Sequence, residues 1–155
     1  MRQKHQLAQV NIAKMNAKDI NDPIMADFVA NIERLNELAE KDENFIWRFK
    51  GDVDFSLPKH SMDVNSLLVT ISVWKSVEGL KKYVHQSMHA EIMKRRKEWF
   101  KHIAGFHYAL WWIPTGQYPS PTNSKRKIIQ LQENGPSKEV FTFKESFPIP
   151  KTSLR

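Results

Sequence analysis

The chain has 155 residues, a net charge of +7 and no cysteine, which excludes disulfides, thiolate metal sites and cysteine nucleophiles. Its length is typical of a single domain that buries roughly 70% of the surface its unfolded chain would expose. The positive charge supports only non-specific contact with phosphates, because no zinc knuckle, Gly-rich KH loop or RNP-type aromatic strand accompanies the two basic runs at residues 94–97 and 125–127.

The N-terminus shows no secretory signal, because MRQKHQ leads directly into a strand-like run without an apolar core. No segment approaches the ~20 apolar residues of a membrane span. We therefore expect a cytoplasmic protein with no membrane partner and no specific nucleic-acid partner.

The first part of the chain predicts a strand, a helix and a second strand. Residues 7–13 alternate between apolar and polar side chains, which is typical of a strand. Asp22 followed by Pro23 is a typical helix start, with an N-cap and a proline in the first turn. Apolar residues then recur every three or four positions and predict an amphipathic helix that ends near residues 40–42. Residues 45–50 predict the second strand.

A polar connection at residues 51–65 precedes three further elements. Residues 67–74 are apolar and rich in β-branched side chains, which predicts a third strand. A helical pattern extends from about residue 77 to residue 101, and the aromatic run at residues 106–113 predicts a fourth strand. The resulting βαββαβ order indicates an α+β, ferredoxin-like fold with an antiparallel sheet and both helices on one face.

We expect one domain, residues 1–155, with its ferredoxin-like core at about 5–114 and a C-terminal extension at 115–155. Pro119 and Pro121 keep the start of the extension open. The rest of it is predicted to contain a short helix at 124–133, an added strand at 140–143 and an extended tail at 147–155.

Trp111 and Trp112 are neighbours in the fourth predicted strand and must lie on opposite faces of the sheet. The helices can cover only one of these faces, and the other face of such a sheet is normally polar. We therefore expect a second sheet, most simply that of a twofold-related copy, to cover the other tryptophan. This arrangement predicts a homodimer.

The face away from the helices is expected to mix aromatic and polar side chains. Aromatic walls with a few convergent polar groups are typical of a small-molecule site, so this face predicts a pocket for a small hydrophobic or aromatic ligand. The alternative is a dimer core whose polar groups bond to one another or to water. Alternation assigns to this face Gln9, Asn11, Thr70, Ser72, Trp74, His107 and Trp111, together with Trp47 or Arg48 according to the register of the second strand.

Two histidines, His85 and His89, lie four residues apart in the expected long helix and so share one face. A metal would need a third ligand in addition, and no HExxH motif supplies one. We therefore expect no metal site, and interpret these residues as hydrogen-bonded histidines at the mouth of the pocket or at an interface.

The same predicted helix ends with Arg95, Arg96 and Trp99. Either arginine could clamp a ligand carboxylate while Trp99 stacks beside it. The alternative is ordinary helix packing with a solvated run of charge. We include all three, together with His85, among the candidate ligand-binding residues.

Several segments then identify a family resemblance. They are FIWRF, ISVWKSVEGLKKYVHQSMHAEIMKRRKEWF, ALWWIPTGQYP and GPSKEVFTFKESFPIP, between Phe45 and Pro150, and the N-terminal LAQVNIAKMNA also fits. With these segments the chain resembles the DUF3291 family, small proteins of unassigned activity in the dimeric α+β barrel superfamily. That superfamily also holds antibiotic-biosynthesis monooxygenases and heme-degrading enzymes. The resemblance implies a fold and a dimer but no established reaction, and PSPTNSKRK departs from the acidic helix start expected there.

The heme-degrading relatives carry an Asn in the first strand and a Trp and a His ten residues apart on the second helix. The corresponding positions in this chain are Asn11, Tyr83 and Met93, so only the Asn is retained. Heme degradation of that kind is therefore not expected, and we expect no cofactor. A heme held in another way remains an alternative, through His85, His89 or His107.

Three functional hypotheses follow. The first is a cofactor-less, monooxygenase-like enzyme in which Asn11 and a histidine, His89 or His107, polarise an aromatic or polyketide-like substrate while tryptophans exclude water. The second is a non-catalytic protein that binds a small molecule or acts as an accessory dimer. The third is a purely structural dimer. The chain has no GxSxG motif and no Gly-rich phosphate loop that would favour another reaction class.

Overall fold

The computed structural model describes residues 4–51, 67–103 and 105–151, so residues 52–65 of the predicted connection lie outside the described part. The strands are β1 (His5–Met15), β2 (Phe45–Arg48), β3 (Leu67–Trp74), β4 (Phe100–Lys101) and β5 (Tyr108–Pro114). The helices are α1 (Ala26–Lys41), with a short 3-10 turn η1 (Pro23–Met25) before it, α2 (Val77–Val84), α3 (Ser87–Lys94), α4 (Arg96–Trp99) and α5 (Pro121–Asn134).

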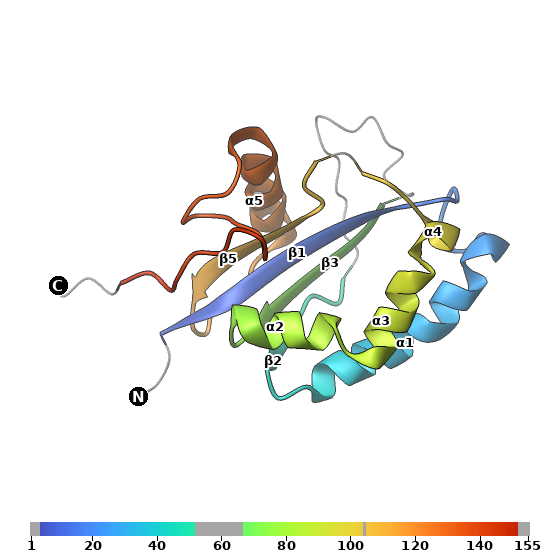
Figure 1. The fold of residues 1–155 in the computed structure, drawn as a ribbon, viewed down its shortest axis with the longest axis horizontal. Helices are drawn as coiled ribbons and strands as arrows, with labels where there is room; N and C mark the ends of the chain where they lie inside the picture. Colours follow the sequence, from blue (N-terminus) through green and yellow to red (C-terminus); the bar gives the residue numbers. More distant parts are fainter. Residues whose placement is uncertain (1–3, 52–66, 104, 152–155) are drawn as a thin grey trace.

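Strand β1 is the centre of an antiparallel sheet (Figure 1). β3 pairs with one edge of β1 along residues 7–14, and β2 pairs with the outer edge of β3. The other edge of β1 pairs with β5 along residues 5–11 and with the short β4 at Lys14 and Met15. The order β2–β3–β1–β5 with antiparallel neighbours is the ferredoxin-like arrangement, so the predicted fold class is confirmed.

The first helix begins as its sequence predicts. The Asp22 carboxylate accepts a hydrogen bond from the backbone N–H of Ile24 (3.0 Å), and Pro23 occupies the first turn. This cap satisfies one of the amides that a helix start leaves without a partner. The turn continues into α1, which ends at Lys41.

The single helix expected over residues 77–101 is wrong, because α2, α3 and α4 replace it. At the first break, His85 Nδ1 donates to the carbonyl of Lys81 (2.7 Å) and Gln86 is extended (φ −66°, ψ 151°). A side-chain bond to the preceding turn competes with continued helix formation. Of the described helices, none is long and apolar enough to cross a membrane.

Tertiary packing explains where this helical segment ends. Trp99 is buried against Phe28, with ring centroids 5.5 Å apart, and the next residue, Phe100, is extended and pairs with Met15 of β1. The chain therefore turns into the sheet one residue after the buried indole. The helical periodicity of the sequence continues through this point, so packing overrides local propensity.

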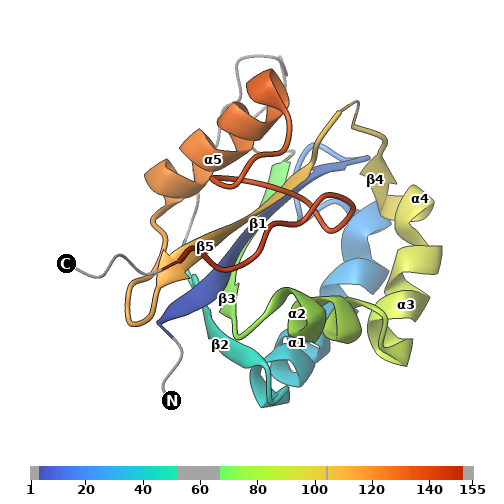
Figure 2. The same ribbon diagram turned by 60° about the vertical axis from the view of Figure 1, so that its left-hand side comes forward.

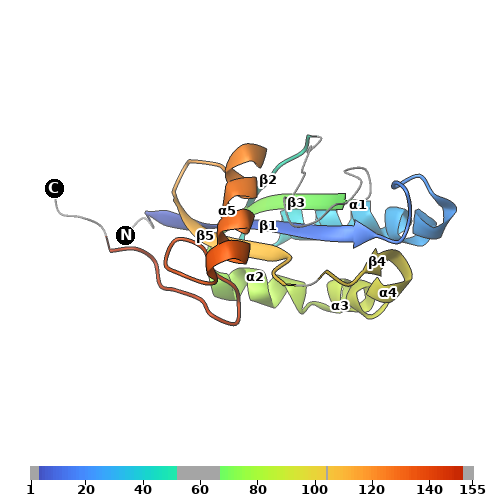
Figure 3. The ribbon, with the colours of Figure 1, turned by 90° about the horizontal axis from the view of Figure 1, so that it is seen from above.

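The two faces of the sheet are covered by different parts of the chain. Figure 2 shows α1, α2 and α3 on one face, which we call the helix side, and α5 on the other, the α5 side. Figure 3 shows α2, α3 and α4 in a row along the helix side. Ile128 and Leu131 of α5 are fully buried in one cluster with Val10 and Trp111. Trp111, 3% exposed, is therefore covered by the chain's own extension, and the inference that it needs a second sheet is wrong.

The C-terminal extension starts its helix three residues earlier than predicted. Ser120 Oγ accepts the N–H of Asn123 (3.0 Å), Pro121 follows in the first turn, and Gly135 at φ 77° ends α5. After α5 the chain returns along the outer edge of β5 (Figure 2), where Phe141 and Leu110 exchange both backbone hydrogen bonds. This isolated bridge takes the place of the added strand predicted at residues 140–143.

The packing of α5 predicts a large cost for truncating its central contact. Ile128→Ala should lower the free energy of unfolding by about 2–5 kcal/mol, because it leaves a cavity between α5 and the sheet. Denaturant-induced unfolding followed by fluorescence measures this change. The matched control is Ile149→Ala, whose side chain is 42% exposed, and it should change the same quantity by less than about 0.5 kcal/mol. Equal losses in the two variants would contradict the packing.

Candidate functional site

The helix-side face carries a band of polar residues across three strands. Strand register places Gln9 between Ser72 and Leu110, and Asn11 between Thr70 and Tyr108. Directly paired residues lie on the same face of an antiparallel sheet. We call this band the polar strip: Gln9, Asn11, Thr70, Ser72 and Tyr108.

One half of the polar strip is internally hydrogen-bonded. The indole Nε1 of Trp74 donates to Ser72 Oγ (2.9 Å), and Ser72 Oγ donates to Gln9 Oε1 (2.9 Å). In the other half, the side chains of Asn11 and Thr70 make no hydrogen bond with any described residue. This half, which we call the second row, therefore presents the Asn11 amide and the Thr70 hydroxyl, both available to a ligand.

The polar strip lies between two separate apolar clusters on the helix side. Leu80 and Tyr83 of α2 pack against Leu7 and Trp74 at one end of the sheet. Met25, Phe28 and Trp99 pack against Met15 at the other end. Between these clusters Thr70 is exposed and Asn11 is half-buried. Solvent therefore reaches the row that contains Asn11 and Thr70.

Three rings connect the strip to α3. The Trp74 and Tyr83 centroids are 5.0 Å apart, and those of Tyr83 and His89 are 5.6 Å apart. The hydroxyl of Tyr83 donates to the carbonyl of Leu35 (3.0 Å), which fixes the middle ring against α1. Burial, with a smaller contribution from the charge of Asp42, raises the pKa of Tyr83 to about 12, so this phenol is neutral at pH 7.

The imidazole of His89 is partly buried beside that ring stack. Burial lowers the pKa of His89, and the nearby backbone of Val84 offsets only part of this effect. Its buried Nδ1 has no hydrogen-bond partner among the described residues. His89 is therefore a neutral imidazole at pH 7, a form that can accept a proton.

Register corrects the predicted grouping of His107 and Trp111 with Asn11. Asn11 pairs with Tyr108, whereas Trp111 pairs with Ala8 and so points to the α5 side. His107 comes just before β5, where its carbonyl accepts the N–H of Ile12 (2.8 Å). Burial, followed by the positive charges of Arg96 and His102, lowers the pKa of His107. Trp111 does lie on the face away from α1, α2 and α3, as predicted. The polar residues predicted on that face lie beneath the helices instead, because the phase of β1 and β3 relative to β5 was assigned wrongly; they are Gln9, Asn11, Thr70, Ser72 and Trp74.

Trp47 is also on the α5 side, because it pairs with Val73 in the same row as Ala8 and Trp111. Its ring stacks on Tyr118, with centroids 4.9 Å apart and planes inclined by 21°. Of the predicted aromatic walls, only Trp74 remains beside the polar strip.

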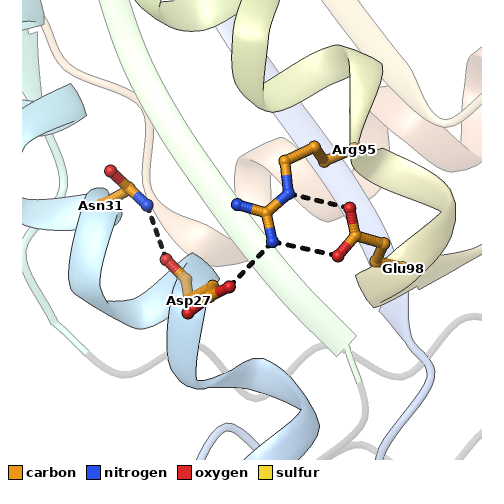
Figure 4. A network of polar contacts seen from close by, with 4 residues as sticks. All are labelled: Asp27, Asn31, Arg95 and Glu98. Carbon is orange, nitrogen blue, oxygen red and sulfur yellow. Dashed lines mark hydrogen bonds and ion pairs between the residues drawn. The ribbon is translucent and has the colours of Figure 1, made fainter.

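Arg95 and Trp99 are brought together by the fold, but the polar contacts of Arg95 are all with other side chains of the protein (Figure 4). The Arg95 guanidinium binds Glu98 through Nε and Nη2 (2.8 and 3.0 Å) and binds Asp27 of α1 through Nη2 (2.8 Å). It also lies 4.7 Å from the centroid of the Trp99 ring. Two carboxylates of the chain therefore occupy the position predicted for a ligand carboxylate.

The remaining predicted ligand residues are exposed and apart from the strip. His85 is exposed at the end of α2, separated from α3 and His89 by the helix break, and Arg96 is exposed on α4. In the described part of the chain, no three His, Cys, Asp or Glu side chains are close enough together to hold a metal ion.

Two residues near the site were not among the sequence-based candidates. Tyr108 completes the row of Asn11, and Tyr83 links Trp74 to His89. Alternation placed Tyr108 on the helix-covered face, where it lies, but Asn11 was predicted on the other face and so the two were not grouped. Tyr83 could be found only by folding α2 onto the sheet, because its contacts join three elements.

Comparison with known proteins assigns a family but no activity. The family model described as "Domain of unknown function (DUF3291)" matches residues 6–155. The comparison with curated proteins gives no match.

Solved structures resemble the chain at low identity. PA3566 from Pseudomonas aeruginosa is 8% identical, with 77% of this chain and 99% of that chain covered and a TM-score of 0.47. SnoaB, a cofactor-independent oxygenase from Streptomyces nogalater, is 14% identical, with 74% and 96% covered and a TM-score of 0.43. MupZ from Pseudomonas fluorescens is 13% identical, with 100% and 92% covered and a TM-score of 0.44.

The two partly buried histidines, His89 and His107, predict a pH dependence of stability. Burial lowers the folded-state pKa of His89 and His107 below the value of about 6.5 expected in the unfolded chain. The unfolded chain therefore binds more protons, so the free energy of unfolding should be highest above about pH 6.5 and decrease as the pH falls below it. His89→Gln and His107→Gln should each flatten this decrease, measured by denaturant unfolding between about pH 5 and pH 7.5. An NMR titration that gave His89 an ordinary or raised pKa would contradict the assignment.

Proposed function

Because the chain belongs to the DUF3291 family, to which no activity is assigned, we propose a function from its own residues: it binds a small aromatic molecule with one or two polar groups at the polar strip. The ligand would lie between the sheet and the helix layer. Asn11 and Thr70 would hydrogen-bond to it, and Trp74 would bound its apolar part.

The observation that carries this proposal is the pair of unsatisfied polar side chains in the second row of the strip. Asn11 is half-buried and Thr70 is exposed, so water can bond to these groups in the free protein and the polar groups of a ligand can replace that water. Within this row Tyr108, by contrast, packs against the cluster around Leu7 and Trp74.

The finer proposal is that the bound molecule is a phenol-type substrate and that the reaction is an oxygenation without a cofactor, the class named for SnoaB. His89, as a neutral base, would take the phenolic proton, and the Asn11 amide would donate to the resulting oxyanion. Dioxygen is the co-reactant. One oxygen atom enters the ring, the other leaves as water, and the phenol is oxidised to a quinone.

A non-catalytic binding protein is the second candidate. It is favoured by the position of His107, which lies apart from the polar strip. Of the two histidines proposed as catalytic, only His89 is connected to the strip, through ring contacts. In this case Asn11 and Thr70 would hold the ligand and no turnover would follow.

Ligand binding is tested with 1-naphthol, an air-stable aromatic with one hydroxyl. It should quench tryptophan fluorescence saturably, because it would bind beside Trp74. Asn11→Ala should weaken binding about fivefold to tenfold by removing one hydrogen bond. The control Asn123→Ala, the same change on α5, should bind as the wild type does. Oxygen uptake with naphthalene-1,4-diol, abolished in His89→Gln, separates the enzyme from the binding protein.

Two results would contradict these proposals. Quenching that is equal in wild type, Asn11→Ala and Asn123→Ala would exclude the polar strip as the binding site. Saturable, Asn11-dependent binding without any enzyme-dependent oxygen uptake would leave only the non-catalytic function.

A homodimer remains a proposal on a different ground from Trp111. Trp47, Phe49 and Val69 are only partly buried where they pack against the cluster on the α5 side, and Tyr118 is 51% exposed. A second copy would cover this aromatic area.

Light scattering at micromolar concentration should give about twice the chain mass of 18.2 kDa. Trp47→Ser should shift the equilibrium towards the monomer, because it removes an aromatic side chain from the proposed contact. A wild-type protein that stays monomeric at this concentration would exclude an obligate dimer, whose interface commonly buries roughly 2,000 Å² or more.

A further inference from the structure

The first row of the polar strip, Gln9 and Ser72, belongs to a chain of hydrogen bonds whose direction is fixed. Strand register places these two residues opposite each other on β1 and β3. The indole Nε1–H of Trp74 donates to Ser72 Oγ (2.9 Å), and Ser72 Oγ donates to Gln9 Oε1 (2.9 Å). An indole nitrogen can only donate, so the chain starts at Trp74 and ends at Gln9.

Packing prevents Trp74 from turning away from this chain. Its side chain is 2% exposed, and its ring centroid lies 5.5 Å from that of Phe45 and 5.0 Å from that of Tyr83. The Ser72 oxygen therefore stays bonded to the indole, and the single hydroxyl hydrogen is left to donate to Gln9. Turning the Gln9 amide over would take the oxygen away from this hydrogen, so the chain selects one orientation of the amide.

The orientation of the amide decides what Gln9 offers to a ligand. Its Oε1 is bonded to Ser72, whereas its Nε2 makes no hydrogen bond with any described residue and is not fully buried. An amide nitrogen carries two hydrogens and no acceptor site. Gln9 therefore presents hydrogen-bond donors on the helix-side face of the sheet.

The second row lies two residues further along β1 and has no such restriction. Residues two apart on one face of a strand are separated by roughly 7 Å, so one small aromatic molecule can reach both Gln9 and Asn11. The Asn11 amide and the Thr70 hydroxyl can each donate or accept, which suits a ligand hydroxyl. The first row instead requires an acceptor.

The acceptor that fits the first row is an uncharged oxygen. None of the five side chains of the polar strip carries a charge, and Arg95, which was expected to bind a ligand carboxylate, is held by Asp27 and Glu98. A carboxylate placed at the strip would lose hydration without gaining a counter-charge. A carbonyl oxygen avoids this cost and can accept from both hydrogens of an amide or from one of them.

We propose that Gln9 determines which ligands the polar strip accepts, and that it selects an aromatic molecule that carries a carbonyl oxygen as well as a hydroxyl group. The carbonyl accepts from Gln9 Nε2 while the hydroxyl binds Asn11 and Thr70. Ser72 is a positioning residue, because it acts on the ligand through the orientation of Gln9. This inference rests on the ligand binding proposed above and narrows the ligand to a hydroxyaryl ketone.

Two ligands that differ in one carbonyl oxygen test this selection on the full chain: 3-hydroxyacetophenone and 3-ethylphenol. In calorimetry the wild type should bind the ketone about fivefold to tenfold more tightly, which is the effect of one hydrogen bond. Gln9→Glu replaces the donor by an acceptor of the same size, so it should abolish this preference and leave the affinity for 3-ethylphenol unchanged. Gln117→Glu, the same change in an exposed loop, is the control and should keep the preference.

Two further variants separate recognition from folding. Gln9→Met is uncharged and of similar length, and it should also lose the preference, so it gives the answer if the thermal midpoint shows that Gln9→Glu is unstable. Ser72→Ala should reduce the preference for the ketone while 3-ethylphenol binds as before. A merely structural role of Ser72 would weaken the binding of both ligands equally.

The results distinguish a failure of this inference from a failure of the function on which it rests. If neither ligand binds saturably, or if Asn11→Ala binds both as the wild type does, the polar strip is not the binding site. If both bind in an Asn11-dependent manner without preference for the ketone, or if Gln9→Glu and Gln9→Met keep that preference, the strip binds ligands but Gln9 does not select them. A preference lost equally in Gln117→Glu would show an effect of net charge alone and would also overturn the inference.

Discussion

The register of β1 with its neighbours determines most of what this molecule can do. β1 pairs along both edges, so each of its residues fixes which residues of β3 and β5 share its face. Asn11 is thereby placed with Thr70 and Tyr108 beneath the helix layer, and Ala8 with Trp111 beneath α5. A shift of one residue in either pairing would exchange the two faces and destroy both cores. The polar strip is consequently as fixed as the apolar clusters around it.

The sequence was sufficient for the order of the four main strands and of α1 and α5, because each of these elements carries a local signal, but it did not predict β4 or the division of the second helix into α2, α3 and α4. The Asp22–Pro23 cap, the β-branched run at 67–74 and the Gly135 stop act within a few residues of where they stand. The faces were harder to predict, because alternation fixes the relative phase within one strand but not between strands. Trp111 and Asn11 were grouped together on that ground, and only the pairing of Trp111 with Ala8 separates them.

The site was partly predictable for the same reason. Asn11, Thr70 and Trp74 were correctly predicted to share one face of the sheet. That face was predicted to point away from the helices, whereas it lies beneath them. The candidate site residues on the predicted long helix could share a face only if that helix was continuous. The breaks at His85 and Arg95 divide these residues among separate helices. Arg95 shows a further limit. Its spacing from Trp99 predicted their contact, but the sequence did not show that Asp27, 68 residues earlier, would occupy the guanidinium.

The bridge between Phe141 and Leu110 has a consequence for how the chain acquires its structure. The central strand, β1, is synthesised before the other strands. β5, which completes the second edge of β1, is the last of the strands to be synthesised, and the extension that covers β5 follows it. Pairings such as Leu7 with Trp112 join segments about a hundred residues apart, and contacts of such long range slow folding. Until α5 and Phe141 have been synthesised, the apolar face of β1 has no complete cover. Exposed apolar surface of this kind promotes aggregation of the incomplete chain.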